Sequence, residues 1–159
     1  MTQNPPPLPA DEALRVNFTQ GLALPAACVE WLLDLWHATQ TLDDFADGDA
    51  VPREALDGLI WRVLVGMPAN AWFAQHAGQL LPAMALAVLK WQAADRAERS
   101  GHADARSFVW RAGYYDIVLM CVMLAHGHEA AGKVSHLVMQ MYGEPFDSYL
   151  NEFLGGSDA

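Results

Sequence analysis

The chain has 159 residues, 53% of them hydrophobic, which suits one domain with a substantial core. Nineteen acidic against nine basic side chains give a formal charge of −10, which disfavours binding to nucleic acid or to a membrane surface. The longest apolar runs, residues 80–89 and 117–125, reach about half a membrane span.

Prolines and glycines divide the sequence into expected helices. Residues 1–9 should form an extended, poorly ordered leader because they are rich in proline. A single all-α bundle domain is expected over residues 10–154, followed by a flexible tail over residues 155–159. Apolar residues at helical spacing predict helices over residues 11–20, 25–47, 52–65, 69–77, 78–99, 103–126, 129–141 and 145–153.

Two of these helices have unusual compositions. In residues 78–99, a stripe of alanines surrounds Lys90, which would let another helix approach closely. The helix over residues 103–126 is apolar nearly all round in its second half, which indicates a central place in the bundle. Cys28 and Cys121 lie in apolar helical context without CxxC spacing, and we interpret them as buried thiols. No signal-like leader precedes them, so a soluble, cytoplasmic protein is expected.

An acidic run, DDFADGD, closes the predicted helix over residues 25–47. At about 100° per residue, Asp43, Asp47 and Gln40 lie within about 60° of one another, on the arc of the apolar side chains earlier in that helix. Asp44 belongs to the same cluster. Because buried carboxylates need arginines, lysines or a metal ion opposite them, an inward-facing run predicts a cation site.

A second interpretation of the acidic run remains open. Gly48 could end the helix, with the carboxylates solvated in the turn that follows. We favour the cation site, because acidic groups at a helix C-terminus oppose the helix dipole. His37 lies one turn before Gln40, near the acidic arc, although a hydrogen-bonded histidine at the edge of the core explains it equally.

A further carboxylate, Asp116, lies on the apolar helix over residues 103–126. We expect this side chain to be buried, where it needs a positive partner, a hydrogen-bond network or a shared metal ion. An ion pair with an arginine such as Arg62 would be the structural explanation. As the opposite wall of the acidic site, Asp116 would instead share its metal.

Arginines and aromatic residues alternate in the first half of the same helix. Arg106 and Arg111 could bind phosphate through bidentate hydrogen bonds. Trp110, Tyr114 and Tyr115 would suit the wall of a site for an apolar or planar substrate. Ordinary amphipathic packing explains these aromatic residues equally well.

The preceding helix carries two more carboxylates, Asp95 and Glu98, three residues apart. They could form a second carboxylate pair. Arg96 and Arg99 beside them indicate instead a solvated, charged face.

The spacing Asp43-Asp44-x-x-Asp47 at the end of a long helix resembles the first DDxxD motif of the isoprenoid synthase superfamily. That resemblance implies a truncated isoprenoid-synthase-like bundle in which the three carboxylates hold Mg²⁺ against a substrate diphosphate. The strings LWHATQTLDDFADGD and FVWRAGYYDIVL are similar to small uncharacterised proteins of tailed bacteriophages and prophages. This second resemblance covers most of residues 25–154 and implies a phage-encoded protein in the cytoplasm of a bacterial host.

Three functions follow from these patterns. The first is Mg²⁺-dependent binding of a diphosphate-containing small molecule, with metal-assisted loss or transfer of diphosphate as the chemistry. The second is an all-α nucleotide pyrophosphohydrolase, which requires glutamate at the position of Gly113. The third is a non-catalytic phage protein that acts by protein–protein contacts, and an exposed apolar helix face could also form a homodimer. Since no second acidic motif is present, we favour a metal-site-bearing bundle of unassigned activity.

Overall fold

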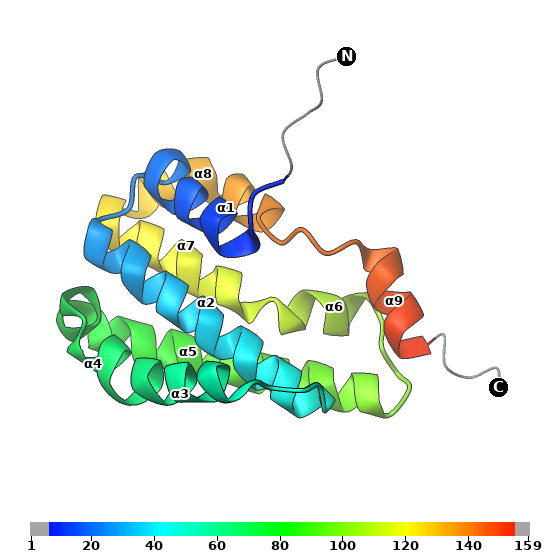
Figure 1. Ribbon diagram of the computed structural model, residues 1–159. Helices are drawn as coiled ribbons and strands as arrows, with labels where there is room; N and C mark the ends of the chain where they lie inside the picture. Colours follow the sequence, from blue (N-terminus) through cyan, green and yellow to red (C-terminus); the bar gives the residue numbers. More distant parts are fainter. Residues whose placement is uncertain (1–6, 155–159) are drawn as a thin grey trace, which may run out of the picture. The chain divides into compact units, whose positions relative to one another are not determined.

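The computed structural model describes residues 7–154, and all regular secondary structure in that range is helical (Figure 1). The all-α prediction is therefore confirmed. Residues 1–6 of the leader predicted over residues 1–9, and the tail predicted over residues 155–159, lie outside the described residues, whereas residues 7–9 are exposed and have no regular secondary structure. Contacts group the chain into two compact units, one ending at Gln75 and the other beginning at His76. A single domain over residues 10–154 stays a prediction.

The first unit is built around one long helix. Its elements, in chain order, are α1 (Ala10–Val16), the π-helical turn η1 (Asn17–Gly21), α2 (Ala26–Asp47), α3 (Arg53–Trp61), the π-helical turn η2 (Arg62–Gly66) and α4 (Met67–Ala69). Proline stands immediately before α1, α2 and α3, where its missing N–H leaves no donor unpaired. Each of the other elements of the unit contacts α2.

The core of the first unit lies along α2. Seven side chains of this helix are buried, Trp31 and Leu32 completely. The Trp31 ring stacks on Phe73 with centroids 5.6 Å apart. Asn70 connects the start of the helix that follows it, at Ala71, to the start of α2. Its Oδ1 accepts hydrogen bonds from the backbone N–H groups of Trp72 and Phe73, and its Nδ2 donates to the carbonyl of Ala27. One side chain thus caps a helix and fixes it to α2.

The long helix α5 (Ala71–Arg99) starts in the first unit and continues into the second. We predicted two helices here, separated near Gly78 and Pro82, and that prediction is wrong. Pro82 lies inside the continuous helix and removes the hydrogen bond to the Gly78 carbonyl. Since both residues are exposed, water can take the place of the missing donor.

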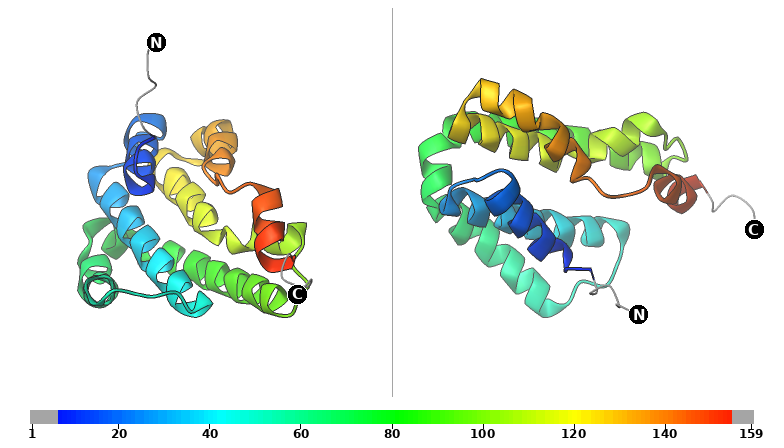
Figure 2. Two further views of the ribbon diagram at one scale, coloured as in Figure 1. Left: turned by 45° about the vertical axis from the view of Figure 1, so that its right-hand side comes forward. Right: turned by 90° about the horizontal axis from the view of Figure 1, so that it is seen from above.

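The second unit continues with α6 (Ala105–Arg111), α7 (Gly113–His126), α8 (His128–Gln140) and α9 (Phe146–Leu154). The predicted helix over residues 103–126 is in fact α6 and α7, bent by 49° at Ala112. After the single residue Gly127, α8 returns along α7 (Figure 2), and these two helices form extensive contacts. The helix α9 packs on α6.

Small residues bring α5 and α7 together, as the alanine stripe predicted. A Cβ atom added at Gly113 would lie 3.0 Å from both Cα and Cβ of Ala87. The two helices therefore touch backbone to backbone at this point. Each unit also contains one fully buried free cysteine, Cys28 in the first and Cys121 in the second, which confirms that the thiols are buried.

Candidate functional site

The acidic run lies in the last turns of α2. Gly48 ends the helix in the left-handed conformation, and the N–H of Asp49 donates to the carbonyl of Asp44. Asp43 is half-buried, whereas Asp44, Asp47 and Gln40 are exposed. The expected inward orientation is therefore wrong for these three residues.

The error follows from the exposure of the end of α2. Leu42 and Phe45 are exposed as well, so apolar and acidic side chains alike face solvent there. A prediction from helical phase assumes a packing partner along the whole helix. In the last turn of α2 every side chain is exposed, so helical phase does not decide burial there.

Within residues 7–154, no group of three or more histidine, cysteine, aspartate or glutamate side chains has the geometry of a metal site. His37 instead has its Nε2 3.7 Å from a carboxylate oxygen of Asp11, and its ring packs edge-on against Trp36. The roles of Asp43, Asp44 and Asp47 as Mg²⁺ ligands stay predictions.

Asp116 is exposed to 60% of its side-chain area, which overturns the expectation that it is buried. Its partner is Lys90 of α5, with Nζ 2.5 Å from Oδ2, and not Arg62. Arg62 pairs with Asp34 of α2 at 3.2 Å. The error arose because helical phase does not show which neighbour a side chain meets: Asp116 lies in the first turn of α7 beside Lys90 of α5, between the buried residues Gly113 and Ile117.

The predicted phosphate-binding and aromatic residues lie in the second unit. Arg106 is exposed and pairs with Asp104, the residue that caps α6, at 2.6 Å. Tyr114 and Tyr115 are partly buried and pack edge to face, with centroids 5.3 Å apart. Trp110 is exposed, and a shared wall of Trp110 with the two tyrosines stays a prediction.

Arg111 belongs to a buried polar network that joins α5, α6 and α9. Its side chain is only 13% exposed, its Nε lies 3.8 Å from Glu98 Oε1, and its guanidinium lies over the Tyr149 ring. The fully buried Tyr149 hydroxyl lies 2.8 Å from the same Glu98 oxygen and 2.6 Å from Ser107 Oγ. Burial raises the pKa of Tyr149 to about 12, and the hydrogen bond to Glu98 also favours the protonated hydroxyl.

Our interpretation of Glu98 as part of a solvated face is wrong, because the side chain is buried in this network. Asp95 pairs with Arg99 on the same helix at 2.7 Å. A signal for the burial of Glu98 was present in the sequence. Ala94 and Glu98 follow Ala87 by seven and eleven residues, so all three share one face of α5. Ala87 on this face is the residue that approaches Gly113 of α7.

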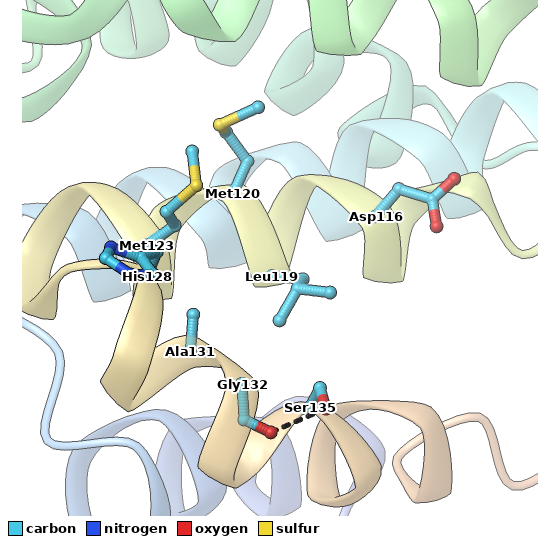
Figure 3. Close-up of a pocket in the computed structure, with 8 residues that line it drawn as sticks. All are labelled: Asp116, Leu119, Met120, Met123, His128, Ala131, Gly132 and Ser135. Carbon is cyan, nitrogen blue, oxygen red and sulfur yellow. Dashed lines mark hydrogen bonds between the residues drawn. The ribbon is translucent and has the colours of Figure 1, made fainter.

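A shallow hollow lies between α7 and α8 (Figure 3). Its volume is about 310 Å³, at the lower end of the range for ligand pockets. The lining is mainly apolar, and Asp116 at its edge is paired with Lys90. The hydroxyl of Ser135 donates to the carbonyl of Gly132 (Figure 3). These polar contacts are made within the protein, so the hollow offers mainly apolar surface.

The largest apolar feature of the first unit is the outer side of α3 and η2, which we call the α3–η2 surface. Trp61 is 65% and Leu64 is 70% exposed. Several of these apolar residues have helical spacing in the sequence, but this spacing does not show which face of the helix is buried. The available signal was that apolar residues continue without a break on both sides of Arg62. The surface consists of Leu56, Ile60, Trp61, Val63, Leu64 and Val65, all more than one third exposed.

An ion pair connects this segment to α2. Arg62 of η2 pairs with Asp34 of α2, and glycines make room for the pair. A Cβ atom at Gly58 would lie 2.9 Å from Arg62 Nη1, and one at Gly66 would lie 3.4 Å from Asp34 Oδ2. The π-helical turn η2 precedes Pro68, which cannot donate to the Leu64 carbonyl. Such turns occur frequently at functional sites.

No single helix within residues 7–154 is long and apolar enough to cross a membrane, and only α6 and α7 taken together, across their bend, satisfy that criterion. Comparison with protein-family models, with curated proteins and with solved structures gives no match for this chain.

Proposed function

We propose that this chain is a non-catalytic helical protein that acts through contact with another protein, and that the α3–η2 surface is its contact site. The observation that carries the proposal is the exposure of Trp61 and Leu64 among six large apolar side chains that lie within ten residues of one another on α3 and η2, all more than one third exposed. Exposed apolar patches of this kind mark interaction sites in soluble proteins. Tryptophan is also the residue type most enriched among side chains that dominate binding energy.

The chemistry of the surface indicates what the partner must offer. The chain carries a net charge of −10, and Glu54 and Asp57 lie on the same helix as the apolar residues. A partner with an apolar groove and basic residues at its edge complements both properties. The resemblance to phage and prophage proteins supports a partner in a bacterial host or in the phage itself.

The test uses three baits in a bacterial lysate. They are the wild-type chain, the variant Trp61→Ser with Leu64→Ser, and the control Met139→Ser, which removes an equally exposed side chain from α8 in the second unit. We expect a protein that the wild type and the control retain, and that the double variant retains at least about tenfold less. That protein is then purified and titrated against the same three chains. Equal affinity for all three, or no retained protein at all, would contradict the proposal.

A second candidate is Mg²⁺-dependent binding of a diphosphate in an isoprenoid-synthase-like bundle, as the DDxxD resemblance implies. The supporting observation is that Asp43, Asp44 and Asp47 lie together in the last turns of α2. In that case, millimolar Mg²⁺ with pyrophosphate should stabilise the folded chain by about 1–3 kcal/mol, and Asp43→Asn with Asp47→Asn should abolish the effect. An unchanged melting temperature in the wild type would remove this candidate.

A further inference from the structure

A second set of exposed apolar side chains lies on the helix α5, in the unit that does not contain the α3–η2 surface. Four large aliphatic side chains are between 53% and 63% exposed. We call this set, together with Ala85 between its members, the α5 face. The four side chains are Leu81, Leu86, Val88 and Leu89.

The geometry of the helix places these residues together. At about 100° per residue, Leu81, Ala85, Val88 and Leu89 fall within an arc of about 100°, and Leu86 extends the arc by about 60°. A solvent-facing arc of a surface helix is normally polar or charged. Here residues 77–89 contain no charged side chain. The first charge that follows, Lys90, lies on the far side of the helix and pairs with Asp116.

From this arrangement we infer that the α5 face binds a second copy of this chain. Two copies with a net charge of −10 each repel one another, so contact between them is opposed least where neither presents charge. The α5 face meets that condition. A two-fold dimer also requires a patch that is complementary to itself, and Ala85 between leucines allows two α5 helices to approach closely.

The exposed area is of the right order for such a contact. Four aliphatic side chains with more than half their surface exposed contribute on the order of 400 Å², which is large for one patch on a monomer. The neighbouring exposed residues of α5, such as Gly78, Pro82 and Gln92, extend the contact toward the roughly 800 Å² per partner of a standard interface. This inference does not depend on the α3–η2 surface.

The primary test is the mass of the chain in solution, measured by sedimentation equilibrium. We expect the wild type to have twice the chain mass of 17.4 kDa. The variant Leu81→Glu with Leu89→Glu should have the mass of one chain and an unchanged far-UV circular dichroism spectrum. The control Leu137→Glu, an exposed apolar residue on α8, should remain a dimer, as should the Trp61→Ser, Leu64→Ser variant.

A cysteine cross-link tests the same contact without introducing charge. Ala85 lies near the middle of the α5 face, so its counterpart in a second copy should be within disulfide reach. The native thiols are fully buried and do not compete. Under mild oxidation, Ala85→Cys should form a covalent dimer, whereas the exposed control Ser148→Cys on α9 should stay monomeric.

Three results would overturn the inference. One is a wild-type chain that sediments as a monomer. Another is a dimer that survives Leu81→Glu with Leu89→Glu, which would place the contact elsewhere. The third is equal cross-linking of Ala85→Cys and Ser148→Cys, which also decides the matter if the glutamate variant fails to fold.

Discussion

The hydroxyl group of Tyr149 is buried, so water cannot take the place of its hydrogen-bond partners. The side chain is fully buried, and Glu98 and Ser107 lie within hydrogen-bond distance of the hydroxyl oxygen. Glu98 also has the guanidinium of Arg111 nearby, with Arg111 Nε 3.8 Å from Glu98 Oε1. Loss of the hydroxyl would leave a buried carboxylate short of one donor, which costs more than the hydrogen bond itself.

The variant Tyr149→Phe keeps the ring and removes only the hydroxyl. We expect it to lower the free energy of unfolding by about 1–3 kcal/mol, measured by urea denaturation. Tyr142→Phe is the matched control, because the Tyr142 hydroxyl bonds with Glu144 in a part-buried site. An equal effect of the two substitutions would show that burial of the network adds nothing.

The same residue makes stability depend on pH in the alkaline range. Burial raises the pKa of folded Tyr149 to about 12 from the ordinary value of 10.0, so the folded chain holds this proton more tightly than the unfolded chain. Its contribution to stability is complete below pH 10 and is lost as the pH rises toward 12. We expect chemical denaturation at several pH values to show a smaller alkaline loss in Tyr149→Phe. Equal loss in both proteins would contradict this assignment.

At the scale of one helix, the end of α2 places carboxylates where its dipole is negative. Asp44 and Asp47 belong to the last turn, which Gly48 closes. Nearby carbonyl groups carry partial negative charge, so acidic side chains here oppose the helix instead of supporting it.

We therefore expect Asp44→Asn to raise the free energy of unfolding by about 0.3–1 kcal/mol at low salt. Thermal melting without divalent cations measures the effect, and Glu54→Gln in the first turn of α3, where a negative charge is favourable, should have the opposite sign. A lower stability of Asp44→Asn would indicate that the carboxylate has a stabilising partner.

Between helices, the contact of α5 with α7 depends on the absence of a side chain. Gly113→Ala would place its Cβ 3.0 Å from backbone and side-chain atoms of Ala87, which cannot rotate away. We expect a loss of about 1–3 kcal/mol in the free energy of unfolding. In Gly132→Ala, inside α8, the new Cβ meets nothing within 4 Å, so this control should gain about 0.5–1 kcal/mol. Similar melting temperatures for the two variants would contradict the close approach.

For the molecule as a whole, the charge of −10 sets how self-association responds to salt. Raising ionic strength from about 0.1 M to about 1 M shortens the Debye length from about 10 Å to about 3 Å, which screens repulsion between the copies. Because the α5 face carries no charge, screening removes no attraction there. We expect the dissociation constant of the dimer to fall with added sodium chloride in sedimentation experiments. A rise would indicate an interface made of ion pairs.

Much of this fold could be predicted from local chemistry. Proline before a helix and glycine after it act on the backbone directly, so the bounds of α2 were predicted nearly to the residue. The same rules failed at Pro82, because the carbonyl it leaves unbonded is exposed and tolerates the loss. They also gave no sign of the bend at Ala112, an ordinary helix former whose conformation depends on the packing of α6 and α7.

The candidate sites were harder to predict than the helices. Helical phase shows which side chains share a face, but the neighbouring helix decides whether that face is buried. Asp116, expected in the core, is exposed, and Glu98, expected in solvent, is buried. For the same reason, the helical spacing of apolar residues in α3 and η2 did not show which of them are exposed. Burial there depends on contacts between residues far apart in the sequence, such as the pair of Arg62 with Asp34 of α2.

The two buried cysteines can report on the unfolding of the protein. Cys28 and Cys121 are each completely enclosed, and each belongs to a different unit. An alkylating reagent can reach either thiol only while the surrounding helices are apart. The labelling rates of the two cysteines in one sample therefore measure the opening of each unit separately. Peptide mass spectrometry distinguishes the two products. The ratio of the two labelling rates at increasing urea concentration then shows whether the two units unfold together or separately.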